Sequence, residues 1–181
     1  MRQRLINRPE LLLGFNGGLK MKTWDSEHAC AFTGHGPEHL QLTEAQVKEW
    51  LEEQIERAAD EGYTDFITGM QRGVDLLAAE AVLKLIDKDR QIRLIAACAF
   101  RGMEEDWDPY WQERYYYVLS RSELVYYISD HPDRRPFLDR NHWMVDRASR
   151  LIAVCSNAPG DTKETIEYAR KKNLDIVMIE R

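Results

Sequence analysis

Short apolar runs alternate along this chain with segments whose apolar residues recur at every third or fourth position. The runs lie at residues 29–33, 65–68, 92–100, 123–128, 151–155 and 174–179. They are apolar throughout rather than at every second residue, which is typical of strands buried on both faces of a parallel sheet. The segments between them, at 44–59, 74–85, 107–119, 136–149 and 162–172, predict helices. The pattern therefore predicts an α/β fold: a doubly wound, mostly parallel, Rossmann-like sheet of about six strands with helices on both faces.

One domain accounts for the 181 residues. We assign it to residues 28–181, because residues 1–27 lack periodicity and contain the turn signal Asn16-Gly17-Gly18. We expect residues 1–27 to be an N-terminal extension, in part disordered. Met21 is a second candidate start, which would leave residues 1–20 outside the core fold. No apolar run approaches the roughly 18 residues of a membrane span, and no cleavage site follows the N-terminal apolar patch, so we expect a cytoplasmic protein.

Charge and cysteine usage narrow the classes of ligand. A formal net charge of −6 argues against a sequence-independent grip on nucleic acid, which depends on a basic face. Cys30, Cys98 and Cys155 sit inside apolar runs, which favours buried thiols. A zinc site is the sharper alternative, but no Cys-x-x-Cys or His-x-x-x-His pair supports it. We therefore expect no metal and no required cofactor.

Ligands of doubly wound sheets bind beyond the carboxyl ends of the strands, so the loops that follow strands are the candidate sites. The first loop contains Thr33, Gly34, His35 and Gly36. Its two glycines allow a ligand close to the backbone, and the threonine and histidine add polar groups. The same residues also suit a tight turn that needs glycine for its dihedral angles.

The second loop, residues 68–75, reads Thr-Gly-Met-Gln-Arg-Gly-Val-Asp and opens a helix. Free N–H groups and the positive end of the helix dipole attract anions there. Its candidate ligand-binding residues are Gly69, Gln71, Arg72, Gly73 and Asp75. Asp75 can accept from a ribose hydroxyl or merely favour the helix dipole. The spacing is neither a P-loop nor a dinucleotide Gly-x-Gly-x-x-Gly motif.

The third loop leads through Gly160, Asp161 and Thr162 into a helix that contains Glu164. A capping box with Asp161 as N-cap and Glu164 three residues later is the structural interpretation, and catalysis by Glu164 is the functional one. Arg140 and Asn141, on another predicted helix, are candidates to reach a phosphate or a base. The aromatic residues at 107, 111 and 115–117 suit packing better than base stacking.

Together these loops resemble the YpsA-like branch of the SLOG superfamily, Rossmann-like domains related to the cytokinin-activating LOG enzymes and to the DNA-processing protein DprA. The segments that carry the resemblance, spread over residues 29–179, are 31–35, 68–75, 78–80, 140–146, 160–162 and 168–169. The resemblance implies a SLOG fold, a pocket for a nucleotide-derived ligand at the loops, and self-association as in SLOG relatives. It implies no reaction. Two positions depart from the family pattern: Gly36 stands where the family has arginine, and Asp161 where it has glycine.

Three functions follow as hypotheses. The first is a sensor, regulator or sequestering domain that binds a nucleotide such as an ADP-ribose-like or NAD-like molecule. The second is a LOG-like phosphoribohydrolase that cleaves the N-glycosidic bond of a nucleoside monophosphate, with Glu164, Asp75 and Arg72 as its candidate catalytic residues. The third is single-stranded DNA binding in the manner of DprA. We rank this hypothesis last because the chain is acidic overall. We expect a small nucleotide as partner, no membrane, and homo-oligomers.

Overall fold

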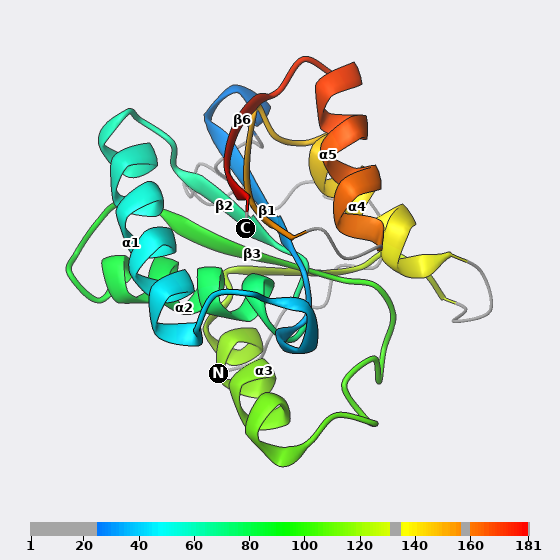
Figure 1. The fold of residues 1–181 in the computed structure, drawn as a ribbon. Coiled ribbons are helices and arrows are strands. Elements are labelled where there is room, and N and C mark those ends of the chain that lie inside the picture. Colours follow the sequence, from blue (N-terminus) through cyan, green and yellow to red (C-terminus); the bar gives the residue numbers. More distant parts are fainter. Residues whose placement is uncertain (1–24, 131–134, 157–159, 181) are drawn as a thin grey trace, which may run out of the picture.

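A computed structural model describes residues 25–130, 135–156 and 160–180 of the chain (Figure 1). The expectations for residues 1–24 therefore lie outside the described residues. Residues 26–28 form a short 3₁₀ turn, Ser26–His28, directly before the first strand. The hydroxyl of Ser149 donates a hydrogen bond of 2.7 Å to the carbonyl of Glu27, which joins this turn to the segment before the fifth strand.

Six strands form one sheet, and every neighbouring pair is parallel. The strands are β1 (Ala29–Gly34), β2 (Asp65–Thr68), β3 (Arg93–Cys98), β4 (Leu124–Tyr127), β5 (Arg150–Cys155) and β6 (Asp175–Glu180). Their order in the sheet is β4-β3-β2-β1-β5-β6. The chain thus winds outward from β1 in one direction and then returns to add β5 on the other side of β1. The predicted doubly wound Rossmann-like α/β fold is confirmed.

Helices cover both faces of this sheet (Figure 1). They are α1 (Glu44–Asp60), α2 (Val74–Ile86), α3 (Pro109–Arg121), α4 (Pro136–Val145) and α5 (Asp161–Lys171). Helices α1, α2 and α3 pack on one face, and α4 and α5 pack on the other. The strands supply both apolar layers, since Cys30 and Phe32 of β1 face the first layer while Ala29 and Ala31 face the second. All four side chains are fully buried, as the unbroken apolar run predicted.

Helix boundaries follow local capping chemistry. The capping box of α1 is confirmed: the hydroxyl of Thr43 accepts from the Gln46 N–H at 3.3 Å, and the Gln46 side chain accepts from the Thr43 N–H at 3.0 Å. Helix α3 begins two residues later than predicted, because Asp108 caps it and Pro109 fits the first helical position. Helix α4 ends four residues earlier than predicted, at Val145, before the turn that leads into β5.

One prediction about capping was wrong. Asp161 is not the N-cap of α5; it is the first residue of the helix, and Gly160 occupies the cap. Gly160 has φ +150° and ψ 177°, a conformation that glycine adopts and that residues with a Cβ rarely do. No side-chain capping bond is made at this end.

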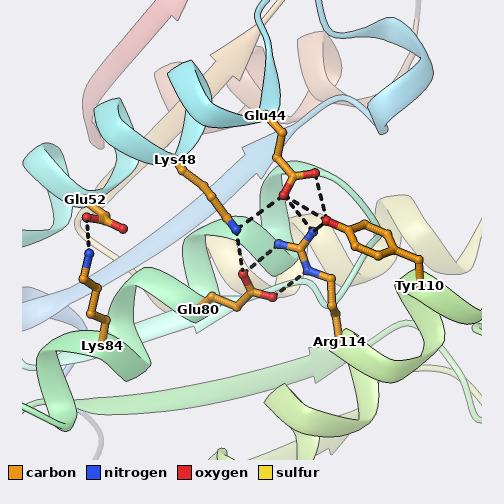
Figure 2. Close-up of polar contacts among 7 residues, drawn as sticks. All are labelled: Glu44, Lys48, Glu52, Glu80, Lys84, Tyr110 and Arg114. Atoms are coloured by element: carbon orange, nitrogen blue, oxygen red, sulfur yellow. Dashed lines mark hydrogen bonds and ion pairs between the residues drawn. The ribbon is translucent and has the colours of Figure 1, made fainter.

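A polar cluster joins the three helices of the first face (Figure 2). Arg114 of α3 donates two hydrogen bonds, of 2.6 and 2.7 Å, to the carboxylate of Glu80 on α2. It donates a third, of 3.0 Å, to Glu44 on α1, and Tyr110 donates to the same carboxylate. Lys48 of α1 lies 3.4 Å from Glu44 and 3.5 Å from Glu80. Glu80, which belongs to the segments that carry the family resemblance, therefore has a structural position between helices.

Cys30, Cys98 and Cys155 are buried and form no disulfide, so the predicted buried thiols are confirmed.

Within the described residues, none of the helices combines the length and the apolar character needed to span a membrane.

Candidate functional site

The order of the strands places the topological switch point of the sheet at the carboxyl edge of β1 and β5, where doubly wound sheets form a ligand crevice. The connection after β1 leads toward β2, whereas the connection after β5 leads toward β6 on the opposite side. Loops that leave neighbouring strands in opposite directions open the space where ligands of doubly wound sheets bind. His35 follows β1 and Ser156 follows β5, so these two residues stand at the switch point.

The loop after β1 packs directly against the start of α2. A Cβ added to Gly34 would overlap the side chain of Val74, the first residue of α2. A Cβ added to Gly73 would lie 2.7 Å from the carbonyl oxygen of His35, closer than real Cβ atoms approach. Gly73 also has φ +92°, which favours glycine. Two glycines therefore allow the first and second loops to touch.

The start of α5 approaches the same histidine from the other side. A Cβ added to Gly160 would lie 3.8 Å from Cε1 and Nδ1 of the His35 ring. The N-terminal glycines of α2 and α5 thus both lie near His35, close enough that an added Cβ would contact it. The buried ring itself stands between them.

The His35 ring is 4% exposed. It donates a hydrogen bond to the backbone carbonyl of Ser156, and its Nε2 atom has no hydrogen-bond partner among the described residues. Burial lowers the pKa of His35; the bond to Ser156 opposes this shift, while the charges of His39 and Lys163 add to it. The ring is therefore neutral at pH 7.

Beneath the second loop lies a buried ion pair. Arg140 of α4 is 3% exposed and Asp75 of α2 is 4% exposed, and Nη1 of the arginine lies 3.6 Å from Oδ2 of the aspartate. The same Nη1 donates to the carbonyl of Gly69, whose missing Cβ leaves room for the guanidinium. Burial raises the pKa of Asp75 to about 6 against the opposing charge of Arg140, and burial lowers the pKa of Arg140.

A chain of hydrogen bonds links Arg140 of this ion pair to helix α5. Nε of Arg140 donates to Asn141 at 2.7 Å, and the Asn141 amide donates to Thr165 at 2.9 Å. The Thr165 hydroxyl in turn donates to the carbonyl of Asp161 at 2.7 Å, in the first turn of α5. Arg140 and Asn141 therefore connect the second loop to the first turn of α5.

The other predicted site residues differ in how far they are exposed to solvent. Thr33 and Thr162 are buried, at 4% and 5% exposure, next to the loops they were assigned to. Gln71 is half-buried, and its Oε1 has no partner among the described residues. Gly36 is half-buried, and a Cβ there would lie 3.1 Å from the carboxylate of Glu38.

Two predicted side chains are paired at the surface. Arg72 bonds Glu38 at 3.1 Å, and Glu164 bonds Arg135 at 2.8 Å. With Asp75 paired to Arg140, the three candidate catalytic residues each contact a different partner. Glu164 also lines an open hollow of about 460 Å³ beside the start of α5, together with His142, Gly160, Lys163, Glu167, Tyr168 and Lys171.

Sequence reasoning missed three polar residues at this edge. Ser156 holds the His35 ring, and Thr165 links Asn141 to α5. Glu104, after β3, is 7% exposed; one carboxylate oxygen accepts from Tyr116 at 2.9 Å and the other, Oε2, has no partner among the described residues. The position of Ser156 directly after a predicted strand was a usable signal. Glu104 lies in an acidic run that suggests an exposed loop, so nothing in the sequence marks it.

A six-stranded parallel sheet, doubly wound about β1 and with glycine-rich loops at its switch point, defines a Rossmann-like α/β domain. The comparisons with known proteins narrow this class. The chain belongs to the YpsA family, whose model, described as "YspA SLOG family", matches residues 30–180. The predicted SLOG membership is confirmed.

Curated proteins similar to this chain include UPF0398 proteins. UPF0398 protein BH1768 of Halalkalibacterium halodurans is 29% identical over 129 residues, which cover 70% of this chain and 68% of the relative. UPF0398 protein BCG9842_B3730 of Bacillus cereus (strain G9842) is 27% identical over 151 residues, which cover 78% of this chain and 82% of the relative.

Solved structures share the fold at low identity. DNA processing protein A (DprA) from Streptococcus pneumoniae matches with a TM-score of 0.58 and 18% identity over 83% of this chain. DprA from Helicobacter pylori, described for its single-stranded DNA binding mode, matches with a TM-score of 0.59 and 14% identity over 83% of this chain. The present chain covers 49% of the first and 64% of the second. The structural genomics target TM1055 matches with a TM-score of 0.53 and 13% identity, covering 82% of this chain and 71% of that one.

Proposed function

We propose that this domain binds a nucleotide or nucleotide-derived molecule, of ADP-ribose-like or NAD-like kind, in the crevice at the carboxyl edge of β1 and β5. In this proposal it acts as a sensor, regulator or sequestering protein. One observation carries the proposal: the N-terminal glycines of α2 and α5, Gly73 and Gly160, both lie against the single residue His35.

Phosphate binding at such a place follows from helix chemistry. The first turn of a helix presents N–H groups without intrahelical partners and the positive end of the helix dipole. Gly73 and Gly160 are the N-cap residues and carry no side-chain oxygen, so neither makes a side-chain capping bond. Two such ends beside one histidine suit an anion with several oxygens, as a phosphate or diphosphate is.

A nucleotide panel tests the proposal. ADP-ribose, NAD⁺, AMP and ADP are added to the protein up to millimolar concentration, and the unfolding temperature is followed. A ligand at one hundred times its Kd stabilises the folded state by about 2.7 kcal/mol, which raises Tm by several degrees. Calorimetry then gives the Kd of any nucleotide that stabilises.

A matched pair of variants locates the binding. Gly160→Ala strains the N-cap of α5 and puts a methyl group against His35, so we expect nucleotide affinity to fall at least ten-fold. Gly62→Ala changes another glycine of positive φ, just after the end of α1 and away from the crevice, and should leave affinity unchanged. Failure of every nucleotide to raise Tm, or equal binding by the two variants, contradicts the proposal.

Hydrolysis of a nucleoside monophosphate is the second candidate, favoured by the position of Glu164 on the hollow beside Gly160. Such chemistry needs a carboxylate near the oxocarbenium-like centre and a cation for the phosphate. The hollow offers Glu164 and Lys163 for these parts. Release of free adenine from AMP, lost in Glu164→Gln but kept in Glu167→Gln, would favour the enzyme over the binding module.

A further inference from the structure

Nε2 of His35 is an unusual atom in this protein. It is a buried polar atom without a partner among the described residues. A Cβ added to Gly160, the N-cap of α5, would lie 3.8 Å from the His35 ring, and one added to Gly73, the N-cap of α2, would lie 2.7 Å from the His35 carbonyl oxygen. An unpaired buried acceptor costs free energy, so native structures seldom keep one without a role. This inference rests on the proposed function, because it concerns the same crevice.

The hydrogen bond to Ser156 fixes which nitrogen carries the proton. The ring donates to the Ser156 carbonyl, and since Nε2 has no partner, Nδ1 is the donor. Burial, together with the nearby His39 and Lys163, keeps the ring neutral at pH 7 because these three effects lower its pKa. A neutral ring with its proton on Nδ1 presents a lone pair at Nε2.

A lone pair selects a hydrogen-bond donor. Phosphate oxygens at neutral pH are acceptors, so they do not complement Nε2. The donors of a nucleotide are its sugar hydroxyls and, in some bases, an amino group. The sugar is bonded directly to the phosphate that the two helix ends attract, so a sugar hydroxyl is the donor that reaches this atom while the phosphate stays at the helix ends.

We propose that Nε2 of His35 accepts a hydrogen bond from a ribose hydroxyl of the bound nucleotide, which makes His35 a residue that distinguishes ribonucleotides from their deoxy analogues. Nε2 has no accessible surface in the free protein, so the groups around the ring shift apart when the hydroxyl arrives. A site built to pair with a hydroxyl discriminates against the analogue that lacks it, because its own polar atom is then left unpaired. We expect a preference of at least ten-fold.

Calorimetric titration tests this with AMP, 2′-deoxy-AMP, 3′-deoxy-AMP and the 2′,3′-dideoxy compound as probes. The wild-type protein should bind AMP at least ten-fold more tightly than the dideoxy compound, and one of the two monodeoxy compounds should share the loss. His35→Phe should abolish the preference by weakening AMP alone. His39→Phe, a change at the neighbouring exposed histidine whose ring centroid lies 6.3 Å from that of His35, should keep it.

The outcomes separate this inference from the proposed function. Equal affinities for AMP and its deoxy analogues in the wild-type protein, or a preference that survives in His35→Phe, overturn the role of His35 while nucleotide binding stands. Absence of binding by any nucleotide, including ADP-ribose and NAD⁺, overturns both.

A second measurement uses the wild-type protein and needs no variant. Nitrogen-15 NMR of the wild-type protein reports which ring nitrogen of His35 carries the proton. We expect a proton on Nδ1 and none on Nε2 at pH 7, with the Nε2 resonance moving when AMP is added. A proton on Nε2 in the free protein would overturn the inference, because that nitrogen would then be a donor.

Discussion

Asp75 sits where burial and a neighbouring charge oppose each other. Burial raises its pKa to about 6, although Arg140 and the Gln71 N–H favour the ionised form. In the unfolded chain the pKa is near 3.8, so between pH 4 and 6 the folded state binds a proton that the unfolded state does not. The stabilisation from this proton is complete below about pH 4 and is lost as pH rises through about 6.

The Asp75→Asn variant tests this balance. As pH falls from 6 to 4, wild-type stability should rise relative to that of the variant, by up to about 1.4 kcal/mol per pH unit. Urea unfolding at several pH values measures the difference. Asp60→Asn, which changes an exposed carboxylate of α1 that pairs with Arg90 at 2.6 Å, provides the comparison at the surface. A difference between wild type and Asp75→Asn that is independent of pH would contradict the assigned shift.

Gly73 is restricted both by its backbone conformation and by a close contact. A comparison with Gly62, which shares only the first restriction, separates the two effects. Gly73 and Gly62 have φ of +92° and +100°, but an added Cβ meets the His35 carbonyl at 2.7 Å in the first case and only the His28 ring, at 4.0 Å, in the second. We expect Gly62→Ala to cost about 1–2 kcal/mol, the strain of the backbone alone. Gly73→Ala should cost about 2–4 kcal/mol, because the clash adds to the strain. Equal losses in urea unfolding would show that the close contact is absent.

The two departures from the family pattern acquire partners in the structure. The charge of Asp161 acts on the buried Arg140, where it favours the charged guanidinium. Gly36 leaves space beside Glu38, which binds Arg72. Asp161 therefore acts on a buried charge, and Gly36 lies beside an ion pair between the first and second loops.

At the level of elements, one arginine of α3 forms ion pairs with both α1 and α2. The Arg114 side chain is 11% exposed, bonds Glu80 and Glu44, and lies over the rings of Tyr110 and Trp111 at 5.0 and 4.5 Å (Figure 2). Arg114→Ala should lower the free energy of unfolding by about 2–3 kcal/mol, between the values of exposed and buried pairs. Amide exchange in α3 should quicken with it.

Lys84→Ala provides the comparison on the same face. Lys84 bonds Glu52 at 2.7 Å, but both side chains are exposed, at 55% and 42%, so its loss should cost less than about 0.5 kcal/mol. Similar losses of unfolding free energy for Arg114→Ala and Lys84→Ala would mean that the partial burial of Arg114 adds nothing to the strength of its ion pairs.

The elements themselves were predictable, and their ends less so. The Thr43 capping box sets the start of α1 from four adjacent residues, so the sequence sufficed. The end of α4 depends on where β5 must join the sheet, and the cap of α5 on a glycine conformation that its neighbours impose. Such boundaries are decided by tertiary packing rather than by local sequence.

At the scale of the whole molecule, the doubly wound sheet followed from the periodicity of apolar residues. The ion pairs at the site did not. Periodicity says which strand precedes which loop, and this placed His35, Gly73 and Gly160 near one another. The partners of charged residues come from distant segments: Arg140 is 65 positions from Asp75, and Arg72 is 34 from Glu38. No spacing rule links such positions, so the buried pair was not foreseen.

The overall charge leads to a prediction about nucleic acid. With a formal net charge of −6, the chain lacks the cationic excess that binding to a phosphate backbone requires. We expect no gel shift of a single-stranded oligonucleotide at micromolar protein and 150 mM salt. A shift that disappears as salt increases would instead support the third hypothesis, the activity named for the Helicobacter pylori DprA structure.

The space around three glycines differs between the α2 side and the α5 side of His35. On the α2 side, Gly34 and Gly73 bring strand end and helix start so close that no methyl group fits between them. On the α5 side, a Cβ added to Gly160 would lie 3.8 Å from the His35 ring, an ordinary van der Waals distance, so a methyl group has room there. We expect an entering molecule to find one stiff wall and one yielding wall, so that α5 moves aside while β1 and α2 stay fixed.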